Sequence, residues 1–385
     1  MPKLKIFVIV SFLLGCAEPI DVEVMETASI LVVDASLTNG AGPHTTRLSF
    51  TFPLDESDEM PVSGATVWIE SAGAERIELS EVEPGTYQTD SSFSATVGES
   101  YSLHILWEGR QLMSDMEVLI PPTEIDEIYA RYIQIPSELD GAFPFGIQFF
   151  LDATGPDGEE GFFRYEYEEA YEVRASFPSQ LEWVPEQRVL IPREPPGLSI
   201  CYQEADSKEL LLGSSSGLTG NKILEYPIRF VPETEMALTS RYAIRIKQFS
   251  IANRTFQFYR DLQENNESAG SFFDSQKGTS FGNIRDVNDP TFPVLGYFEV
   301  AGVSEKELEL TLDDFIDLGY RPQRNSDCPN SVLDTIGIGG VEEYLRLNPF
   351  ALPVFIFGIG SVVMSPRSCS DCRVFGDLEV PELLQ

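Results

Sequence analysis

The stretch GESYSLHILW (residues 98–107) contains the alternation that decides the fold class. Tyr101, Leu103 and Ile105 place an apolar side chain at every second position, which is typical of a strand with one buried face. Short apolar segments separated by turn signals recur on both sides of it: Ile30–Leu37, Thr45–Phe52, Ala65–Ile69, Arg76–Leu79, Thr86–Asp90 and Gln111–Leu119. About seven short strands in about 100 residues predict an immunoglobulin-like β-sandwich over residues 28–122.

The remaining residues, 123–385, are expected to form a larger β-rich C-terminal domain with one or two short helices. Pro121-Pro122 marks the boundary. Several segments beyond it are rich in aromatic and β-branched residues, which favour strands: Ile125–Ile133, Gly146–Asp152, Phe162–Val173, Leu198–Tyr202, Ile223–Phe230, Tyr242–Phe249 and Gly296–Val300. Residues 252–264 predict a helix, and residues 313–317 predict a second, shorter one. The fold class is therefore mainly β.

The most apolar stretch is FALPVFIFGIGSVVM (residues 350–364). Pro353, Gly358 and Gly360 interrupt it, and it is shorter than the roughly 20 residues that a membrane-spanning helix needs. We expect a buried strand that leads into a loop with two cysteines. The alternative is a hydrophobic contact with a membrane partner.

The N-terminus reads MPKLKIFVIVSFLLGCAEP. Lys3 and Lys5 precede an uncharged apolar run from Ile6 to Leu14, which is the pattern of a secretory signal. Cys16 directly follows Gly15, and this arrangement resembles the lipobox of bacterial lipoproteins, in which the cysteine carries the lipid (palmitate). We predict a signal peptide over residues 1–15, lipidation of Cys16 and an acidic tether over 16–27. The alternative is an ordinary secretory signal in which Cys16 is incidental.

Four cysteines remain after Cys16, and an even number fits two disulfides with three possible connectivities. They are Cys201, Cys328, Cys369 and Cys372. A bridge within the CxxC pair would close a short loop and remove little entropy from the unfolded chain. Bridges from Cys201 and Cys328 to that pair are therefore favoured. A redox motif or half of a zinc site is the alternative for CxxC.

Composition limits the partners and the chemistry. The net charge of −36 repels nucleic acid, so no nucleic-acid partner is expected. The only histidines are His44 and His104, too few for a zinc-protease motif or a Ser-His-Asp triad. The Gly-x-Ser-x-Gly match at 213–217 has no histidine after it and predicts a turn. We expect no catalytic residue, no cofactor and no metal ion.

Two acidic clusters leave a calcium site as an alternative, because Ca²⁺ prefers oxygen ligands. The first is formed by Asp55, Asp58 and Glu59, and neither cluster has the spacing of an EF-hand. The second lies in a loop and consists of Asp152, Asp157, Glu159 and Glu160. Solvated acidic loops are the favoured interpretation of both clusters.

Several segments together resemble a known family. They are ILVVDASLTN (30–39), VSGATVWI (62–69), PGTY (84–87), GESYSLHI (98–105), YEVRAS (171–176), FQFYRDLQENNESAGSFFDS (256–275), FGNIRDVNDPTFPVLGYFEVAG (281–302) and SCSDCR (368–373). With the lipobox, their order looks like the Bacteroidota outer-membrane lipoproteins called domain of unknown function 4249. The chain departs from the family in having only Cys201 where paired cysteines are common, and in its end, VFGDLEVPELLQ.

The resemblance implies a function by association. Such lipoproteins accompany SusC-like TonB-dependent transporters, so this chain is expected in the outer membrane, facing the cell exterior. There it would help capture an unknown extracellular ligand or gate the barrel. Phe162, Phe163, Tyr165 and Tyr167 could line the interface, although alternation along a strand means that roughly half of them must face a core instead. Two alternatives remain: a structural or adhesive surface lipoprotein, and a hydrolase that uses two carboxylates.

Overall fold

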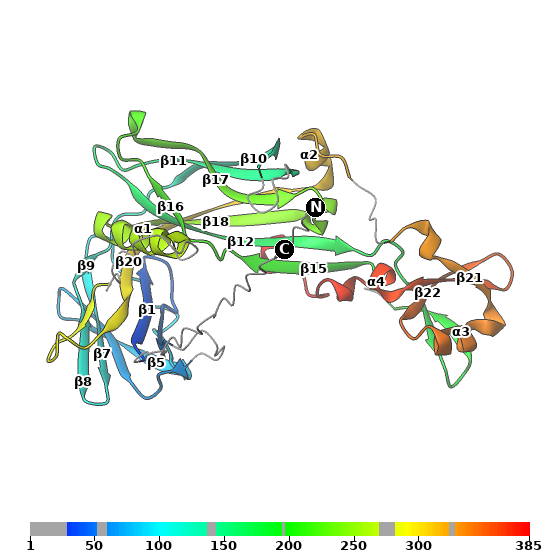
Figure 1. The fold of residues 1–385 in the computed structure, drawn as a ribbon, viewed down its shortest axis with the longest axis horizontal. Helices are drawn as coiled ribbons and strands as arrows, with labels where there is room; N and C mark the ends of the chain where they lie inside the picture. The colour runs from blue at the N-terminus through cyan, green and yellow to red at the C-terminus, as the bar shows by residue number, and fades with distance from the viewer. Residues whose placement is uncertain (1–28, 52–59, 137–143, 195–196, 269–281, 323–327) are drawn as a thin grey trace, which may run out of the picture.

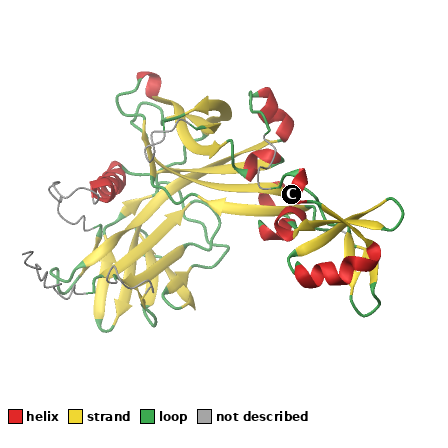
Figure 2. Ribbon diagram, turned by 45° about the vertical axis from the view of Figure 1, so that its right-hand side comes forward, coloured by secondary structure: helices red, strands yellow, loops and turns green. Residues whose placement is uncertain are grey.

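The computed structural model describes residues 29–51, 60–136, 144–194, 197–268, 282–322 and 328–385. Within these ranges the chain is mainly β with few short helices, which confirms the predicted fold class (Figures 1 and 2). The strands form an N-terminal sandwich, a central sandwich and a small C-terminal module. The N-terminal sandwich and the C-terminal module lie at opposite ends of the long axis (Figure 1).

The N-terminal sandwich buries the alternating residues that the sequence analysis identified. Val33, Leu48, Leu103 and Ile105 are each at most 1% exposed and pack in one core. Strand β5 pairs with both β4 and β6 and so joins the two layers. The strands from this part of the chain are β1 (Leu31–Thr38), β2 (Thr45–Phe50), β3 (Met60–Pro61), β4 (Thr66–Ser71), β5 (Arg76–Glu83), β6 (Thr86–Gln88), β7 (Ser100–Trp107), β8 (Arg110–Ser114) and β9 (Glu117–Val118).

Residues far beyond the expected boundary at 122 also belong to this sandwich. Strand β19 (Ile284–Asp286) pairs with β8. The first half of β20 (Val294–Leu310) runs parallel to β1, from the pair Leu31–Val294 to the pair Thr38–Ala301. A parallel pair needs a long crossover connection, and here the central sandwich lies between the two strands in the sequence. The N-terminal sandwich is therefore completed by segments from the second half of the chain.

The second half of β20 belongs to the central sandwich, where it pairs antiparallel with β18 (Tyr242–Ser250). The change of partner occurs at Gly302, where an added Cβ would lie 2.2 Å from the carbonyl oxygen of Ile120. Only glycine lets the 120–122 connection pass this close to β20. One strand thus links the two sandwiches.

The central sandwich has two layers. One has the order β15–β12–β18–β20, and the other has the order β10–β11–β17. Phe149, Phe163, Tyr242 and Ile246 lie between the layers, fully buried. The further strands of the two layers are β10 (Ile125–Gln134), β11 (Phe145–Thr154), β12 (Phe162–Arg174), β15 (Ile200–Asp206), β16 (Leu211–Ser214) and β17 (Lys222–Pro232).

The two expected helices form beside this sandwich. Helix α1 (Asn253–Ser268) extends the predicted helix by one turn, and α2 (Leu312–Asp317) matches the shorter one. Thr311 caps α2, since its side chain accepts a hydrogen bond from the backbone N–H of Asp314. Phe256 of α1 packs against Phe162, with ring centroids 5.2 Å apart.

The C-terminal module has a core of few residues. Val341, Val362 and Met364 are fully buried there, and Trp183 packs against them. Its elements are β13 (Leu181–Val184), β14 (Val189–Pro192), β21 (Asp334–Gly337), α3 (Val341–Leu347), β22 (Ala351–Phe357) and β23 (Ser361–Pro366). Strand β23 lies between β21 and β22, so the apolar stretch 350–364 forms a hairpin and not one buried strand.

Candidate functional site

The two histidines are packing residues of the N-terminal sandwich. His44 is 7% exposed and lies edge-on to Phe93, while His104 is 8% exposed and stacks on Trp68 with ring centroids 5.0 Å apart. Burial lowers the pKa of both imidazoles. Both rings are therefore neutral at pH 7.

The acidic clusters do not come together as cation sites in the described part of the chain. Asp55, Asp58 and Glu59 lie outside the described residues. In the second cluster, Asp152 accepts hydrogen bonds from the hydroxyl of Tyr129 and the backbone N–H of Glu225. Among the residues that the structure describes, no three His, Cys, Asp or Glu side chains are grouped to hold a metal ion.

The four aromatic residues suggested for an interface are occupied inside the protein. Phe163, Tyr165 and Tyr167 belong to the core of the central sandwich, and Phe162 packs against α1. Alternation along β12 sends side chains to two faces. One face is buried under the second layer, and the other, which α1 covers beside Phe162, is only partly buried. Alternation predicts that roughly half of these rings face a core. The structure places three of the four there, because Phe163, Tyr165 and Tyr167 share one face of β12, so the four rings do not form an exposed partner surface.

A pocket of about 590 Å³ lies where the C-terminal tail meets β15. The tail is held there by two backbone hydrogen bonds: the N–H of Tyr202 donates to the carbonyl of Asp377 at 2.7 Å, and the N–H of Asp377 donates back at 2.9 Å. Farther along, Arg241 donates to the carbonyl of Leu384, which is buried. The last residues of the chain are thus part of the folded structure.

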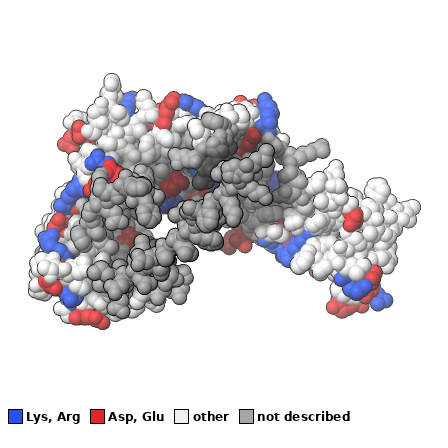
Figure 3. Space-filling model, in the orientation of Figure 1, with Lys and Arg blue, Asp and Glu red and all other residues white. Residues whose placement is uncertain are grey.

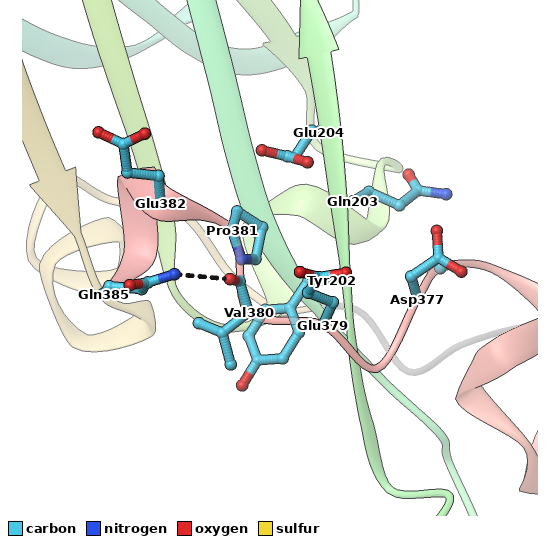
Figure 4. A pocket seen from close by; sticks show the side chains of 10 residues that line it. Tyr202, Gln203, Glu204, Asp377, Glu379, Val380, Pro381, Glu382 and Gln385 are labelled. Atoms are coloured by element: carbon cyan, nitrogen blue, oxygen red, sulfur yellow. Dashed lines mark hydrogen bonds between the residues drawn. The ribbon is translucent and has the colours of Figure 1, made fainter.

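Carboxylates dominate the lining of this pocket. Figure 4 shows Glu204, Asp377, Glu379 and Glu382 around it, with the amide of Gln385 donating to the carbonyl of Val380 at 3.1 Å. Four carboxylates in one concave surface repel an anionic ligand. The pocket suits a neutral polar or cationic group.

The most unusual surface is at the end of the β22–β23 hairpin. Gly358 and Gly360 have positive φ and form the turn. The residues beside them are exposed: Ile356 by 50%, Phe357 by 63% and Ile359 completely. A contiguous exposed apolar surface marks a site of interaction with another molecule or a membrane.

The part of the module next to the turn adds to this apolar surface. The backbone N–H of Ile338 donates to the carbonyl of Gly360 at 2.9 Å, and the Ile338 side chain is 42% exposed. We define the hairpin tip as Ile338, Phe355, Ile356, Phe357 and Ile359. Residues 335–341 and 347–366 contain no charged side chain. Figure 3 shows this end of the molecule mostly white, with charged side chains gathered at its lower edge.

Two disulfides hold the C-terminal module in place. Cys201 of β15 is bonded to Cys372, and Cys328 is bonded to Cys369. Both bridges therefore join Cys201 and Cys328 to the CxxC pair, as the sequence analysis favoured. The first bridge ties the end of the module to the central sandwich, and the second ties it to the segment that enters β21. Cys16, the predicted lipidation site, lies outside the described residues.

One residue that the sequence analysis did not single out lies between the bridges. Asp371 is 1% exposed, and its carboxylate accepts hydrogen bonds from the guanidinium groups of Arg367 and Arg373. Burial acts to raise the pKa of Asp371, but the two arginines and the backbone N–H of Arg373 outweigh it and the pKa is lowered. The available signal was the aspartate within SCSDCR, flanked by arginines on both sides.

No helix in the described ranges combines the length and the apolar character needed to cross a bilayer. No curated protein matches the chain. A family model matches residues 17–307, which is most of the chain. Its description is Domain of unknown function (DUF4249), and the chain belongs to that family.

Proposed function

We propose that this protein is a lipid-anchored accessory protein of the outer membrane that works beside a SusC-like TonB-dependent transporter, in ligand capture or gating. The observation that carries the proposal is the lipobox-like sequence ending at Cys16, in a chain that belongs to the domain of unknown function 4249 family. The lipid holds the protein at the membrane, facing the cell exterior.

The described part of the molecule supports binding in preference to catalysis. Both histidines are buried packing residues, so neither is available as a general base. The carboxylates that are most deeply buried are engaged by arginines, as Asp371 and Glu299 are. The acidic pocket at the tail and the hairpin tip are two surfaces of the described residues that are open to a binding partner.

Affinity purification from membranes dissolved in mild detergent tests the proposal. A C-terminal tag on the wild-type chain is expected to co-purify an outer-membrane barrel. The matched control is Cys16→Ser, which removes the acceptor for the lipid and should reduce recovery of the barrel and release the protein from the membrane fraction. Recovery of the wild-type lipoprotein alone would count against the transporter partnership.

A further inference from the structure

The hairpin tip exposes both faces of one strand. Successive side chains of a strand point to opposite faces, so Phe355 and Phe357 lie on one face of β22 and Ile356 lies on the other. Phe355 is 39% exposed, Ile356 is 50% exposed and Phe357 is 63% exposed. A flat protein surface would cover one of these faces and leave the other in water. The occupant must therefore surround the tip.

The backbone hydrogen bonds of the tip determine which environment it can enter. Phe355, Ile356 and Phe357 pair with Val363, Val362 and Ser361 of β23, so the hairpin satisfies its own inward-facing hydrogen-bonding groups. The outward-facing groups of this short edge need water or lipid head groups as partners. These requirements suit the boundary between head groups and acyl chains and not the centre of a bilayer.

Charge argues against a second copy of the chain as the occupant. Each copy has a net charge of −36, so two copies repel one another. The same charge opposes approach to an anionic surface. An uncharged tip on a strongly acidic protein therefore fits a partner with an apolar interior and an electrically neutral surface.

We propose that the hairpin tip inserts into the head-group boundary of a neutral lipid bilayer, as a second point of membrane contact. The nearness of a membrane rests on the proposed lipid at Cys16. Residues 16–28, between that cysteine and the first described residue, can span at most about 45 Å. The tether joins the N-terminal sandwich, which lies at the opposite end of the long axis from the tip, so both contacts form together when that axis lies along the membrane.

Flotation with vesicles tests the tip separately from the anchor. The unlipidated Cys16→Ser chain is mixed with phosphatidylcholine vesicles, and the bound fraction is measured across lipid concentrations. The double variant Phe357→Ser/Ile359→Ser is expected to bind at least about tenfold more weakly, because it removes the two most exposed side chains of the tip. The control is Leu224→Ser, which changes a side chain of β17 that is 61% exposed.

Folding of the module is checked by the fluorescence of Trp183, which packs against its core. In a second measurement, Phe357→Trp should be quenched by brominated phosphatidylcholine, whereas Leu224→Trp should not be. The proposal is overturned if the unlipidated chain does not bind the vesicles, or if the double variant binds them as well as the control does. A dimer that the double variant dissociates, without vesicle binding by the wild type, would assign the tip to a second copy instead. Because Cys16→Ser is used throughout, these outcomes are independent of whether a transporter is recovered in the purification.

Discussion

The buried ion pair between Arg164 of β12 and Glu299 of β20 is a sensitive point of the structure. The guanidinium donates to both carboxylate oxygens, with Nε–Oε2 at 2.9 Å and Nη2–Oε1 at 2.7 Å. The side chains are 11% and 1% exposed, and the centroid of the Phe249 ring lies 4.1 Å from the guanidinium carbon. Glu299 lies in the half of β20 that pairs with β1, so the pair connects the central sandwich to the N-terminal one.

Glu299→Leu should destabilise the protein by about 3 kcal/mol, the lower end of the usual 3–5 kcal/mol for breaking a buried pair. The lower end applies because Glu166, 46% exposed, remains as a second partner of Arg164. Adding Arg164→Met removes the unpaired charge, so the double variant should recover most of the loss. The control is Asp34→Asn. Its partner Arg47 is 3.6 Å away and both side chains are more than 60% exposed, so the cost should stay below about 1 kcal/mol.

Urea unfolding followed by tryptophan fluorescence measures these changes. Trp68 and Trp107 report on the N-terminal sandwich and Trp183 reports on the C-terminal module, while hydrogen exchange in β12 and β20 reports on the central sandwich. Because β20 belongs to both, both signals should shift together in Glu299→Leu. A loss no larger than that of Asp34→Asn, or a double variant less stable than the single one, would refute the reasoning.

Three further changes probe other parts of the structure. Gly302→Ala places a Cβ 2.2 Å from a backbone oxygen and should cost about 1–3 kcal/mol in urea unfolding. The control Gly337→Ala has open space around the added Cβ and should cost less than about 1 kcal/mol. Equal costs would contradict the close approach of the 120–122 connection to β20. Asp371→Asn should cost about 1–3 kcal/mol at pH 7. Because the pKa of Asp371 is lowered in the fold, the stabilisation is present above about pH 4 and disappears as the pH falls through the folded pKa. The free energies of unfolding of the wild type and the variant should therefore converge in acid. A constant difference between them down to about pH 2 would contradict this. Replacing Cys201 and Cys372 by alanine opens a loop closed across 171 residues and should cost about 5 kcal/mol by chain entropy. Opening the Cys328–Cys369 bridge, which spans 41 residues, should cost about 4 kcal/mol. The reverse order of the two losses in thermal unfolding would contradict this reasoning.

The regular elements were predictable where a local pattern decides the structure. Tyr101, Leu103 and Ile105 alternate and lie buried in β7, as the period of two requires. The helix expected over 252–264 forms as α1. The pairing of Cys201 and Cys328 with the CxxC cysteines followed from the entropy of loop closure, although the individual partners could not be assigned.

What the sequence did not reveal depends on contacts between distant segments. Nothing local in Val294–Leu310 indicates that one half pairs with β1 and the other with β18. The apolar stretch 350–364 predicts burial by composition, yet Phe357 and Ile359 are exposed because the module has too few other residues to cover them. Gly358 and Gly360 were the local signal for a turn there. The four rings of β12 do not form an exposed interface because three of them share the face that packs against the second layer.

The attachment of the protein through Cys16 is the central claim, and the intact mass of the protein purified from membranes tests it most directly. The account predicts a chain that lacks residues 1–15 and carries acyl groups on Cys16, with Cys16→Ser found in the soluble fraction without them. An unmodified cysteine, or a chain that retains residues 1–15, would contradict it.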